Sequence, residues 1–497
     1  MKYIITACLW VGLLTTAQAQ NLTDALRYGQ NNNNGTARYL GAGGAFGALG
    51  GDLTAIGDNP AGSAIFAQSQ LTGTLNVNRY ENEALYFQDF NDSRGNDLGF
   101  SQLGGVFVIP ASDYTGKLTL GFNYNRTNNY NTNYRVSGIS NLSIDSYFLG
   151  FADGVSLDLL KTQDNESIGD LYQFLGENFS FNEQQAMLGF QAFVIEPVED
   201  DPANREYISN ISGNSFEQNY NYESFGSSGK FTFNLGYEAA EGFFIGGNLN
   251  THFFDFERRT TFEEFKGSGP ASNRLVFNNT LRTLGNGFSA QVGTILHLSP
   301  RWRVGANYDT PTWFTITEEI RQDLTNFEAS STFVVDPQFT NVYPDYDLRT
   351  PGKVGAGIAY VLGLQGFISF DYSYQDFANT QFQPIDDLFF SELNQQVSQE
   401  LAAVSMFKIG AEYRYNAWSY RAGYQFEQSP YKNDLILGSL FRYSAGLGYS
   451  WEAIRLDLAY TLSQQDSLQA FYDSQFSNAY SLKGRLSNIV ATLSFSL

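Results

Sequence analysis

The stretch SMFKIGAEYRYNAWSYRAGYQFEQ, residues 405–428, alternates two kinds of side chain and decides the fold. In its first half Phe407 and Ile409 fall on one face of an extended chain, and Lys408 and Glu412 fall on the other. A short turn follows, and the second half repeats the pattern. A period of two is the mark of β-strands, whose successive side chains point to opposite faces.

Five segments at the C-terminal end share this pattern: 405–416, 418–428, 439–450, 454–462 and 488–497. One face offers 24 positions without a charge, whereas the other carries seven charges in 20 positions. A Lys or Arg on the lipid face at mid-bilayer costs about 2–4 kcal/mol. The one-sided exclusion of charge therefore predicts a transmembrane β-barrel. A soluble β-sandwich is the alternative, but its outward face is the polar one and its strands are shorter.

Nine upstream segments extend the count to fourteen strands, an even number, as such barrels require. The connections alternate strictly between short and long, which matches short periplasmic turns and long outer loops. Predicted outer loops include 81–99 and 128–225. The nine candidate strands are 68–80, 100–110, 116–127, 226–239, 242–260, 274–298, 301–318, 350–361 and 366–377.

The N-terminus has the features of a bacterial secretory signal peptide. Lys2 precedes an apolar run over 3–14, and Ala17-Gln18-Ala19 is a small-residue site, so we expect cleavage after Ala19. No later apolar run approaches the roughly 20 residues that a spanning helix needs. These features predict a multi-pass barrel in a bacterial outer membrane. The only cysteine, Cys8, lies in the segment to be removed, which excludes thiol chemistry from the mature chain.

Residues 20–67 precede the first strand and do not alternate, although they are dense in glycine. A Walker phosphate loop needs Gly-Lys-Ser/Thr, which is absent, and a dinucleotide fingerprint needs a strand before it. Small residues also allow tight packing and unusual backbone angles in a confined place. We therefore predict that 20–67 is a hatch that plugs the barrel of 68–497. Its motif residues are Gly43, Gly44, Phe46, Gly50, Gly51, Asn59, Pro60 and Ala61.

Four runs carry a resemblance to a known family: 35–62 in the hatch, 310–313 (Thr-Pro-Thr-Trp), 348–353 (Leu-Arg-Thr-Pro-Gly-Lys) and 366–374. They resemble the FadL/TodX outer-membrane transporters, in particular a Bacteroidetes-type branch. The chain departs from the family at Ala42, where Met is common, and at Leu497, where many barrels end in Phe.

The resemblance implies a fourteen-stranded barrel with a hatch and helix-containing outer loops. It further implies passive uptake of long-chain fatty acids or aromatic hydrocarbons. In that mechanism the ligand is captured at the outer face, the hatch rearranges, and the ligand leaves sideways into the bilayer. By the same resemblance we expect the lateral exit in the early strands, near 116–127.

Two loop segments predict amphipathic helices that would form an apolar capture groove on the outer side. Phe390, Leu393 and Val397 recur at helical spacing within 378–404, and residues 168–175 do so in the longest loop. The alternative is that these faces bury against each other and give the loops a core.

Charged residues on the lumen face allow two interpretations. They pair across strands with Glu412 and Asp457 and fill the lumen, or one or two of them hold the carboxylate of a ligand. Under the second interpretation, five lumen cations are candidate ligand-binding residues, in addition to Phe390, Leu393 and Val397 of the predicted groove. These cations are Lys408, Arg414, Arg421, Arg442 and Arg455.

An enzyme is not expected. Alternation places His252 and His297 on separate strands, with no Ser or Asp spacing that indicates a hydrolase, and a lone barrel histidine is usually structural. The sequence predicts no cofactor and no metal. The leading hypothesis is a transporter of hydrophobic small molecules, and the alternatives are a general porin and a structural or adhesive barrel.

The charge distribution bears on partners. The formal net charge is −22, and residues 131–225 alone hold fifteen acids and three bases. This balance argues against nucleic acid as a partner. A solvated acidic surface is one explanation, and divalent cations that bridge the loop to lipopolysaccharide are another. The remaining expected partners are outer-membrane lipids and the barrel-assembly machinery.

Overall fold

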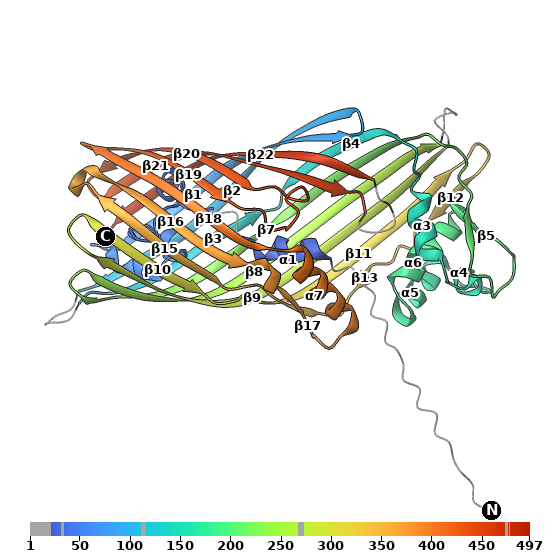
Figure 1. Cartoon of the computed structure of the whole chain (residues 1–497), viewed down its shortest axis with the longest axis horizontal. Coiled ribbons are helices and arrows are strands. Elements are labelled where there is room, and N and C mark those ends of the chain that lie inside the picture. Colours follow the sequence, from blue (N-terminus) through green and yellow to red (C-terminus); the bar gives the residue numbers. More distant parts are fainter. Residues whose placement is uncertain (1–20, 31–33, 111–115, 267–272, 473–475, 477) are drawn as a thin grey trace, which may run out of the picture.

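The computed structural model describes residues 21–30, 34–110, 116–266, 273–472, 476 and 478–497 (Figure 1). The predicted signal peptide, 1–19, lies outside the described residues. Within them, no helix is both long and apolar enough to cross a membrane.

The strands pair antiparallel with their neighbours and close on themselves, since Gln70 of the first strand pairs with Ser496 of the last. This confirms the predicted fourteen-stranded barrel in the described part of the chain. Four of the fourteen strands are interrupted and are given below as two elements each. The fourteen strands, in chain order, are β1 (Gln70–Tyr86), β2 (Asp89–Ile109), β3 (Leu118–Asn129) with β4 (Thr132–Ser140), β7 (Phe216–Ala240), β8 (Phe243–Lys266), β9 (Arg274–His297), β10 (Trp302–Asp309) with β11 (Trp313–Phe327), β14 (Tyr346–Arg349) with β15 (Lys353–Val361), β16 (Gly366–Asp376) with β17 (Gln381–Gln383), β18 (Ala403–Tyr415), β19 (Trp418–Glu427), β20 (Leu440–Trp451), β21 (Ile454–Ala470) and β22 (Ala479–Ser496).

Several strands are longer than a bilayer requires. Each crossing needs about 9–11 residues, whereas β8 has 24. Its outward face is apolar at Phe243, Ile245 and Leu249 and then charged from Asp255, which forms an exposed ion pair with Arg282. The bilayer band therefore ends near Asp255, and the rest of β8 stands outside the membrane. The end with the long connections is the outer end, and the opposite end is the turn end.

This extension corrects one prediction. The expected outer loop 81–99 is instead a continuation of β1 and β2, which pair from Gln70↔Val106 to Tyr86↔Asp89. The prediction was wrong because it sought an apolar outward face, and beyond the bilayer both faces of a strand are polar. For the same reason β4 and the first part of β7 lie within the predicted loop 128–225.

A helical cap covers the outer end (Figure 1). It consists of four helices and a small hairpin, and its core joins the strand ends through buried side chains such as Phe148, Tyr172, Phe262 and Phe277. The predicted helix near 168–175 is confirmed within it. The cap elements are α3 (Asp145–Ala152), α4 (Leu157–Leu160), α5 (Ile168–Asn178), α6 (Phe181–Gln191), β5 (Ile195–Pro197) and β6 (Tyr207–Ser209), beside the short β12 (Thr332–Val335) and β13 (Asn341–Val342).

The first described residues, in the blue segments of Figure 1, lie inside the barrel. α1 (Leu22–Gly29) lies beside α7 (Leu388–Glu400), the second predicted loop helix, which is also confirmed. α2 (Ala37–Gly41) and the 3-10 turns η1 (Ala55–Gly57) and η2 (Pro60–Ile65) contact the inner wall nearer the turn end. The 3-10 turns η3 (Gly363–Gln365) and η4 (Phe377–Asn379) belong to the wall strands.

Candidate functional site

The hatch contacts the wall at van der Waals distance because both surfaces lack side chains where they meet. A Cβ atom on Gly410 of β18 would lie 2.0 Å from the carbonyl oxygen of Ala42, and one on Gly423 of β19 would lie 2.1 Å from the nitrogen of Gly43. Gly43 itself has a φ of +64°, a region that favours glycine. The predicted glycine motif of the hatch is thus matched by glycines of the wall.

Sequence reasoning missed these wall glycines. The signal was present, since Gly410 and Gly423 occupy lumen positions in the alternation where polar or charged residues would be expected. A glycine at a lumen-facing position of a barrel strand marks close approach of another backbone.

Polar side chains fix the remaining hatch backbone. Asn59 of the predicted motif donates from Nδ2 to the carbonyl oxygens of Gly47 at 2.7 Å and Thr294 at 3.0 Å. Asn234 of β7 donates to the Pro60 oxygen at 2.9 Å. The hatch is therefore held to the wall by hydrogen bonds as well as by apolar contacts, such as that of Phe46 with Phe367 of β16.

An ion cluster joins the hatch to β18–β21. The buried carboxylate of Glu412 lies 3.3 Å from Arg38 of the hatch, 2.6 Å from Arg421 and 2.6 Å from Arg414. Arg421 also lies 2.8 Å from Asp457, which pairs with Arg455 at 2.9 Å. Three of the predicted ligand cations, Arg414, Arg421 and Arg455, thus pair with the carboxylates of Glu412 and Asp457. This is the arrangement that the first interpretation of the lumen charges described.

The other two predicted cations lie elsewhere. Lys408 donates to the Tyr39 hydroxyl and to Asp58 of the hatch, both at 3.1 Å. Arg442 donates to Ser463 at 2.8 Å and Gln425 at 3.2 Å. These contacts do not show whether any of the five cations binds a ligand, so their ligand role stays a prediction.

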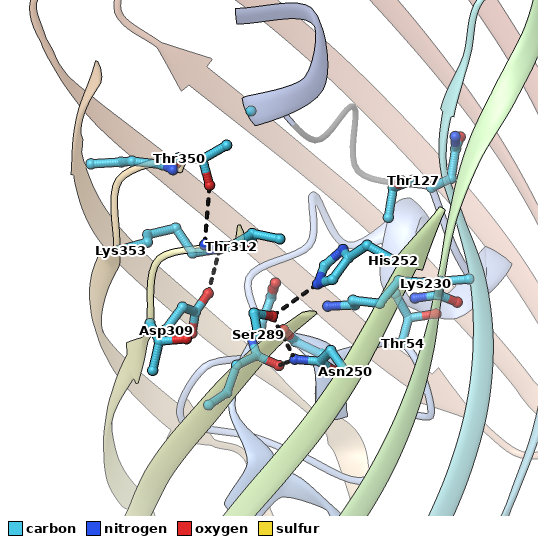
Figure 2. Close-up of a pocket in the computed structure, with 18 of the residues that line it drawn as sticks. Thr54, Thr127, Lys230, Asn250, His252, Ser289, Asp309, Thr312, Thr350 and Lys353 are labelled. Atoms are coloured by element: carbon cyan, nitrogen blue, oxygen red, sulfur yellow. Dashed lines mark hydrogen bonds and ion pairs between the residues drawn. The ribbon is translucent and has the colours of Figure 1, made fainter. Parts of the chain in front are cut away.

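A polar cavity lies above the hatch, with a volume of about 90 Å³. At roughly 10–15 Å³ per water molecule it has room for several waters or one small head group. Figure 2 shows Thr350, Lys353 and Asp309 on one side and His252 and Lys230 on the other. Asp58 and Lys353 also line a second hollow that reaches Lys408.

Lys230 is the cation of this cavity that lacks an ion pair. Lys353 is paired with Asp309 at 3.1 Å, and Arg126 with Asp97 at 3.6 Å. For Lys230 no carboxylate lies within 4.0 Å in the described part of the chain, although Asp309 and Asp58 act on it from farther away. Its ammonium group is therefore available to an anion in the cavity.

His252 and Ser289 form a second polar feature that the sequence did not indicate. The His252 Nε2 atom lies 2.8 Å from the Ser289 hydroxyl, and Asn250 donates to that hydroxyl at 3.3 Å (Figure 2). The two residues come from neighbouring strands, β8 and β9, so only the sheet register brings them together. They give the cavity wall side chains that donate and accept hydrogen bonds.

The apolar face of α7 lies above the cavity. Phe390, Leu393 and Val397, the predicted groove residues, are buried in one cluster with Leu26 and Tyr28 of α1. Tyr28 stacks on Phe254 with ring centroids 4.0 Å apart. The helix faces thus bury against other elements, as the alternative interpretation described, while the ligand role of these residues stays a prediction.

Over the described residues, no group of three or more His, Cys, Asp or Glu side chains is placed to hold an ion.

Comparison with solved structures shows the fold. The Pseudomonas aeruginosa FadL homologue matches with a TM-score of 0.53 and 11% identity, over 94% of this chain and 98% of that one. The Ralstonia pickettii toluene transporter TbuX gives 0.51 and 12%, over 94% and 99%. The Pseudomonas putida toluene transporter TodX gives 0.53 and 13%, over 94% and 100%. No family model matches the sequence, and no curated protein matches it.

The fold and the filled lumen define a class: a fourteen-stranded transmembrane barrel whose lumen is filled by its own N-terminal segment. Within that class, the chain has the fold of FadL and TodX. The fold expected from the resemblance is confirmed, and the Bacteroidetes-type branch stays a prediction.

Proposed function

We propose that this chain is a FadL/TodX-type transporter that carries hydrophobic small molecules with an anionic end across the outer membrane. The observation that supports this most directly is the polar cavity beneath an apolar cluster. There Lys230, which has no carboxylate within 4.0 Å in the described part of the chain, lies beside His252 and on the same cavity wall. An amphiphile has this same division between a charged head and an apolar tail.

The cavity favours a fatty acid over an aromatic hydrocarbon. A carboxylate gains charge-assisted hydrogen bonds from a lysine, each contributing about 1.5–3 kcal/mol. A molecule such as toluene would leave the same groups without partners, which costs about 1–3 kcal/mol for each buried group. Long-chain fatty acids are therefore the proposed substrates.

The proposed route has three stages. The ligand is captured at the outer face beside α7, its head reaches the cavity as the hatch with its helix α1 rearranges, and the ligand leaves sideways into the bilayer. The signal peptide cleaved after Ala19, assembly by the barrel-assembly machinery and contact with lipopolysaccharide belong to the same proposal.

A seam in the early strands suits the lateral exit. β2 pairs with β3 only up to Gln102↔Asn125, and beyond this point no ladder joins β2 to β3 or β4 within the described ranges. Side chains bridge the seam instead: Asp97 accepts from Asn129 at 2.9 Å and from Asn131 at 2.8 Å. Opening here breaks side-chain contacts and leaves the main-chain ladder intact.

A general porin is the alternative from another class. It would need an open lumen, whereas here the hatch backbone packs so closely on the wall glycines Gly410 and Gly423 that a Cβ atom on either would not fit. Large single-channel conductance of the wild-type protein in planar bilayers would favour the porin. A purely structural or adhesive barrel would show neither conductance nor uptake.

The test is uptake of labelled oleate and toluene by cells with and without the gene, and by cells with Lys230→Gln. Wild type should raise oleate uptake, and Lys230→Gln should lower it by about tenfold, since one charge-assisted hydrogen bond of about 1.5 kcal/mol is lost. Toluene uptake should not change with this variant.

Lys483→Gln is the matched control, because Lys483 is exposed at the outer part of β22. It should transport oleate as wild type does. Equal oleate uptake with and without the gene would refute transport of fatty acids, and an equal effect of both lysine variants would refute the cavity as the head-group site.

A further inference from the structure

The outward faces of β22, β1 and β2 each carry an arginine soon after their apolar run ends. On β1, Arg79 is the next outward residue after Val77, the last residue of that run. On β22 and β2 the corresponding residues are Arg485 and Arg94, and one polar outward position separates each of them from its apolar run. All three side chains are exposed. Because the three strands are neighbours in the barrel, these arginines form one surface feature, here called the arginine patch.

A tyrosine fixes the height of the arginine patch relative to the bilayer. The Tyr460 hydroxyl of β21 lies 3.1 Å from the Ser487 hydroxyl of β22, and Tyr460 is 45% exposed on the outward face. An aromatic ring with a polar tip marks the membrane–water interface. Ser487 is the ladder neighbour of Arg79, and Arg485 lies one outward position farther out than Ser487. The patch therefore lies where the head groups of the outer leaflet begin.

In the described strands β22, β1 and β2, one carboxylate stands among the three guanidinium groups of the patch. Glu81 is the ladder neighbour of Arg94 on one side and of Arg485 on the other, and Arg79 precedes it on the same face. Its carboxylate lies 3.0 Å from Arg79 and 3.9 Å from Arg94. The patch is thus a positively charged surface in a chain whose net charge is −22.

The next carboxylates lie farther from the bilayer. Glu83 and Asp92 are neighbours in the ladder of β1 and β2, one outward position beyond Glu81. Glu83 lies 3.7 Å from Arg485, and Asp92 lies 3.4 Å from Arg94. Both distances exceed that of an ordinary N–H···O hydrogen bond, and exposed ion pairs stabilise a protein little. An anion that approaches from the bilayer side can therefore compete with these partners.

The side of the barrel from β8 to β14 has acidic residues at the same level. On β8 the first outward charge after the apolar run is Asp255, which pairs with Arg282, and Glu257 follows it. Asp345 and Asp347 accept hydrogen bonds there from threonines of β11. An anionic head group is repelled by this side and attracted by the arginine patch. The positive charge is therefore local and does not run around the whole rim.

We propose that the arginine patch binds the phosphate of a lipid A molecule in the outer leaflet. Guanidinium forks bind phosphate oxygens with paired hydrogen bonds. The apolar outward residues below the patch, such as Val77 and Ile489, are placed to contact the acyl chains of the same lipid. A free phosphate ion would gain only the first of these contacts, so the site is assigned to a lipid.

This site lies on the outside of the barrel and is independent of what the lumen carries. It also differs from the bridging of the acidic loop by divalent cations, because the arginines contact the phosphate directly. Its readout is the binding of lipid A, so a failure of oleate uptake would refute the transport function and leave this proposal standing.

The first test measures lipid A binding to the purified full chain by native mass spectrometry, in buffer without divalent cations. A triple variant of the patch should bind about a hundredfold more weakly, since each cation near a membrane surface contributes about fivefold. The triple variant is Arg79→Gln with Arg94→Gln and Arg485→Gln.

The matched control removes three exposed arginines from the acidic side of the barrel: Arg259→Gln, Arg282→Gln and Arg321→Gln. It changes the net charge of the chain by the same amount as the triple variant of the patch, and it should bind lipid A as wild type does. Equal losses in the two triple variants would overturn the site.

The second test uses a change that should improve binding. Glu81→Gln removes the carboxylate that competes for the arginines, so lipid A should bind about fivefold more tightly. Glu257→Gln on the acidic side should leave the affinity unchanged. Weaker binding by Glu81→Gln would contradict a site governed by charge, and an improvement in a folded variant cannot result from unfolding.

The third test separates the phosphate from the acyl chains. Wild type should bind lipid A without its phosphates about a hundredfold more weakly than lipid A, and the triple variant of the patch should bind both forms alike. Equal binding of both forms by wild type would show acyl-chain contact alone and would overturn the phosphate site. Millimolar inorganic phosphate should not displace lipid A, and displacement would overturn the assignment to a lipid.

Discussion

The two sides of the lumen are built differently. From β18 to β22 the ladder is continuous, and the wall meets the hatch through glycines and the Glu412 ion cluster. From β10 to β17 the ladder is interrupted, and a polar cavity replaces direct hatch contact near the interruptions. The difference teaches that one wall anchors the plug by close packing and ion pairs, while the other leaves a polar space beside its interrupted ladder.

The largest expected effect comes from breaking the anchor. Glu412→Ala should lower the free energy of unfolding by about 3–5 kcal/mol, because it leaves several guanidinium groups, including the fully buried Arg421, without their shared carboxylate. The measurement is urea unfolding in lipid vesicles. Arg414→Ala, which removes a partner whose side chain is 38% exposed, should cost under about 1 kcal/mol, and equal losses would contradict the anchor.

The second effect concerns the cap at the outer end. Glu264 lies near the outer end of β8, outside the bilayer band, and its side chain is buried. Burial raises the pKa of Glu264 to about 7, although Ser143, Gln218 and the Ile144 nitrogen donate to it. Its contribution to stability is then present below pH 4.5 and is lost as the pH rises through about 7, a change of roughly 3 kcal/mol.

Hydrogen exchange of the amides of α3 measures this change, after correction for the intrinsic pH dependence. Protection should fall by about a hundredfold between pH 5 and pH 8, at 1.4 kcal/mol per factor of ten. Glu264→Gln should remove the pH dependence. A variant that keeps the wild-type slope would show that other groups govern the cap.

The anchoring wall was the side that sequence could predict. Alternation over 405–497 gave the strands, their two faces and the charged lumen positions, because each strand there has one lipid face and one lumen face. The partners of those charges could not be predicted, since Arg38 meets Glu412 only after 374 residues of chain have closed the barrel.

The cavity side was harder to predict. Thr310 to Thr312 lay inside one predicted strand, 301–318. A period-two pattern hides such an interruption when the residues after it point to the same two faces as those before it. The prolines were the visible warning, as proline is rare in central strands. Lys230, His252 and Ser289 approach each other through register and barrel closure, which no local pattern encodes.

The third effect sharpens the role of close packing on the anchoring wall. Gly410→Val places side-chain atoms where the Ala42 carbonyl lies, so it should destabilise the plugged state by about 1–3 kcal/mol and raise single-channel conductance in planar bilayers. Gly73→Val is the control, because a Cβ there meets only the Leu103 side chain at 3.7 Å. Unchanged conductance of Gly410→Val would mean that the hatch yields without opening a path.

The smallest effect tests the interrupted wall itself. Thr350→Val removes the acceptor of the Thr312 nitrogen, so the free energy of unfolding should fall by only about 0.5–1.5 kcal/mol. Because that bond joins two strands where their ladder is interrupted, between Asp309↔Lys353 and Trp313↔Arg349, exchange of the Thr312 amide should still rise by about tenfold. Thr461→Val changes an equally buried threonine in the intact ladder of β20 and β21, where main-chain bonds remain and amide exchange should stay at the wild-type rate. If both variants left exchange unchanged, the interrupted ladder would be as firmly closed as the anchoring wall, and the two sides would differ in shape alone.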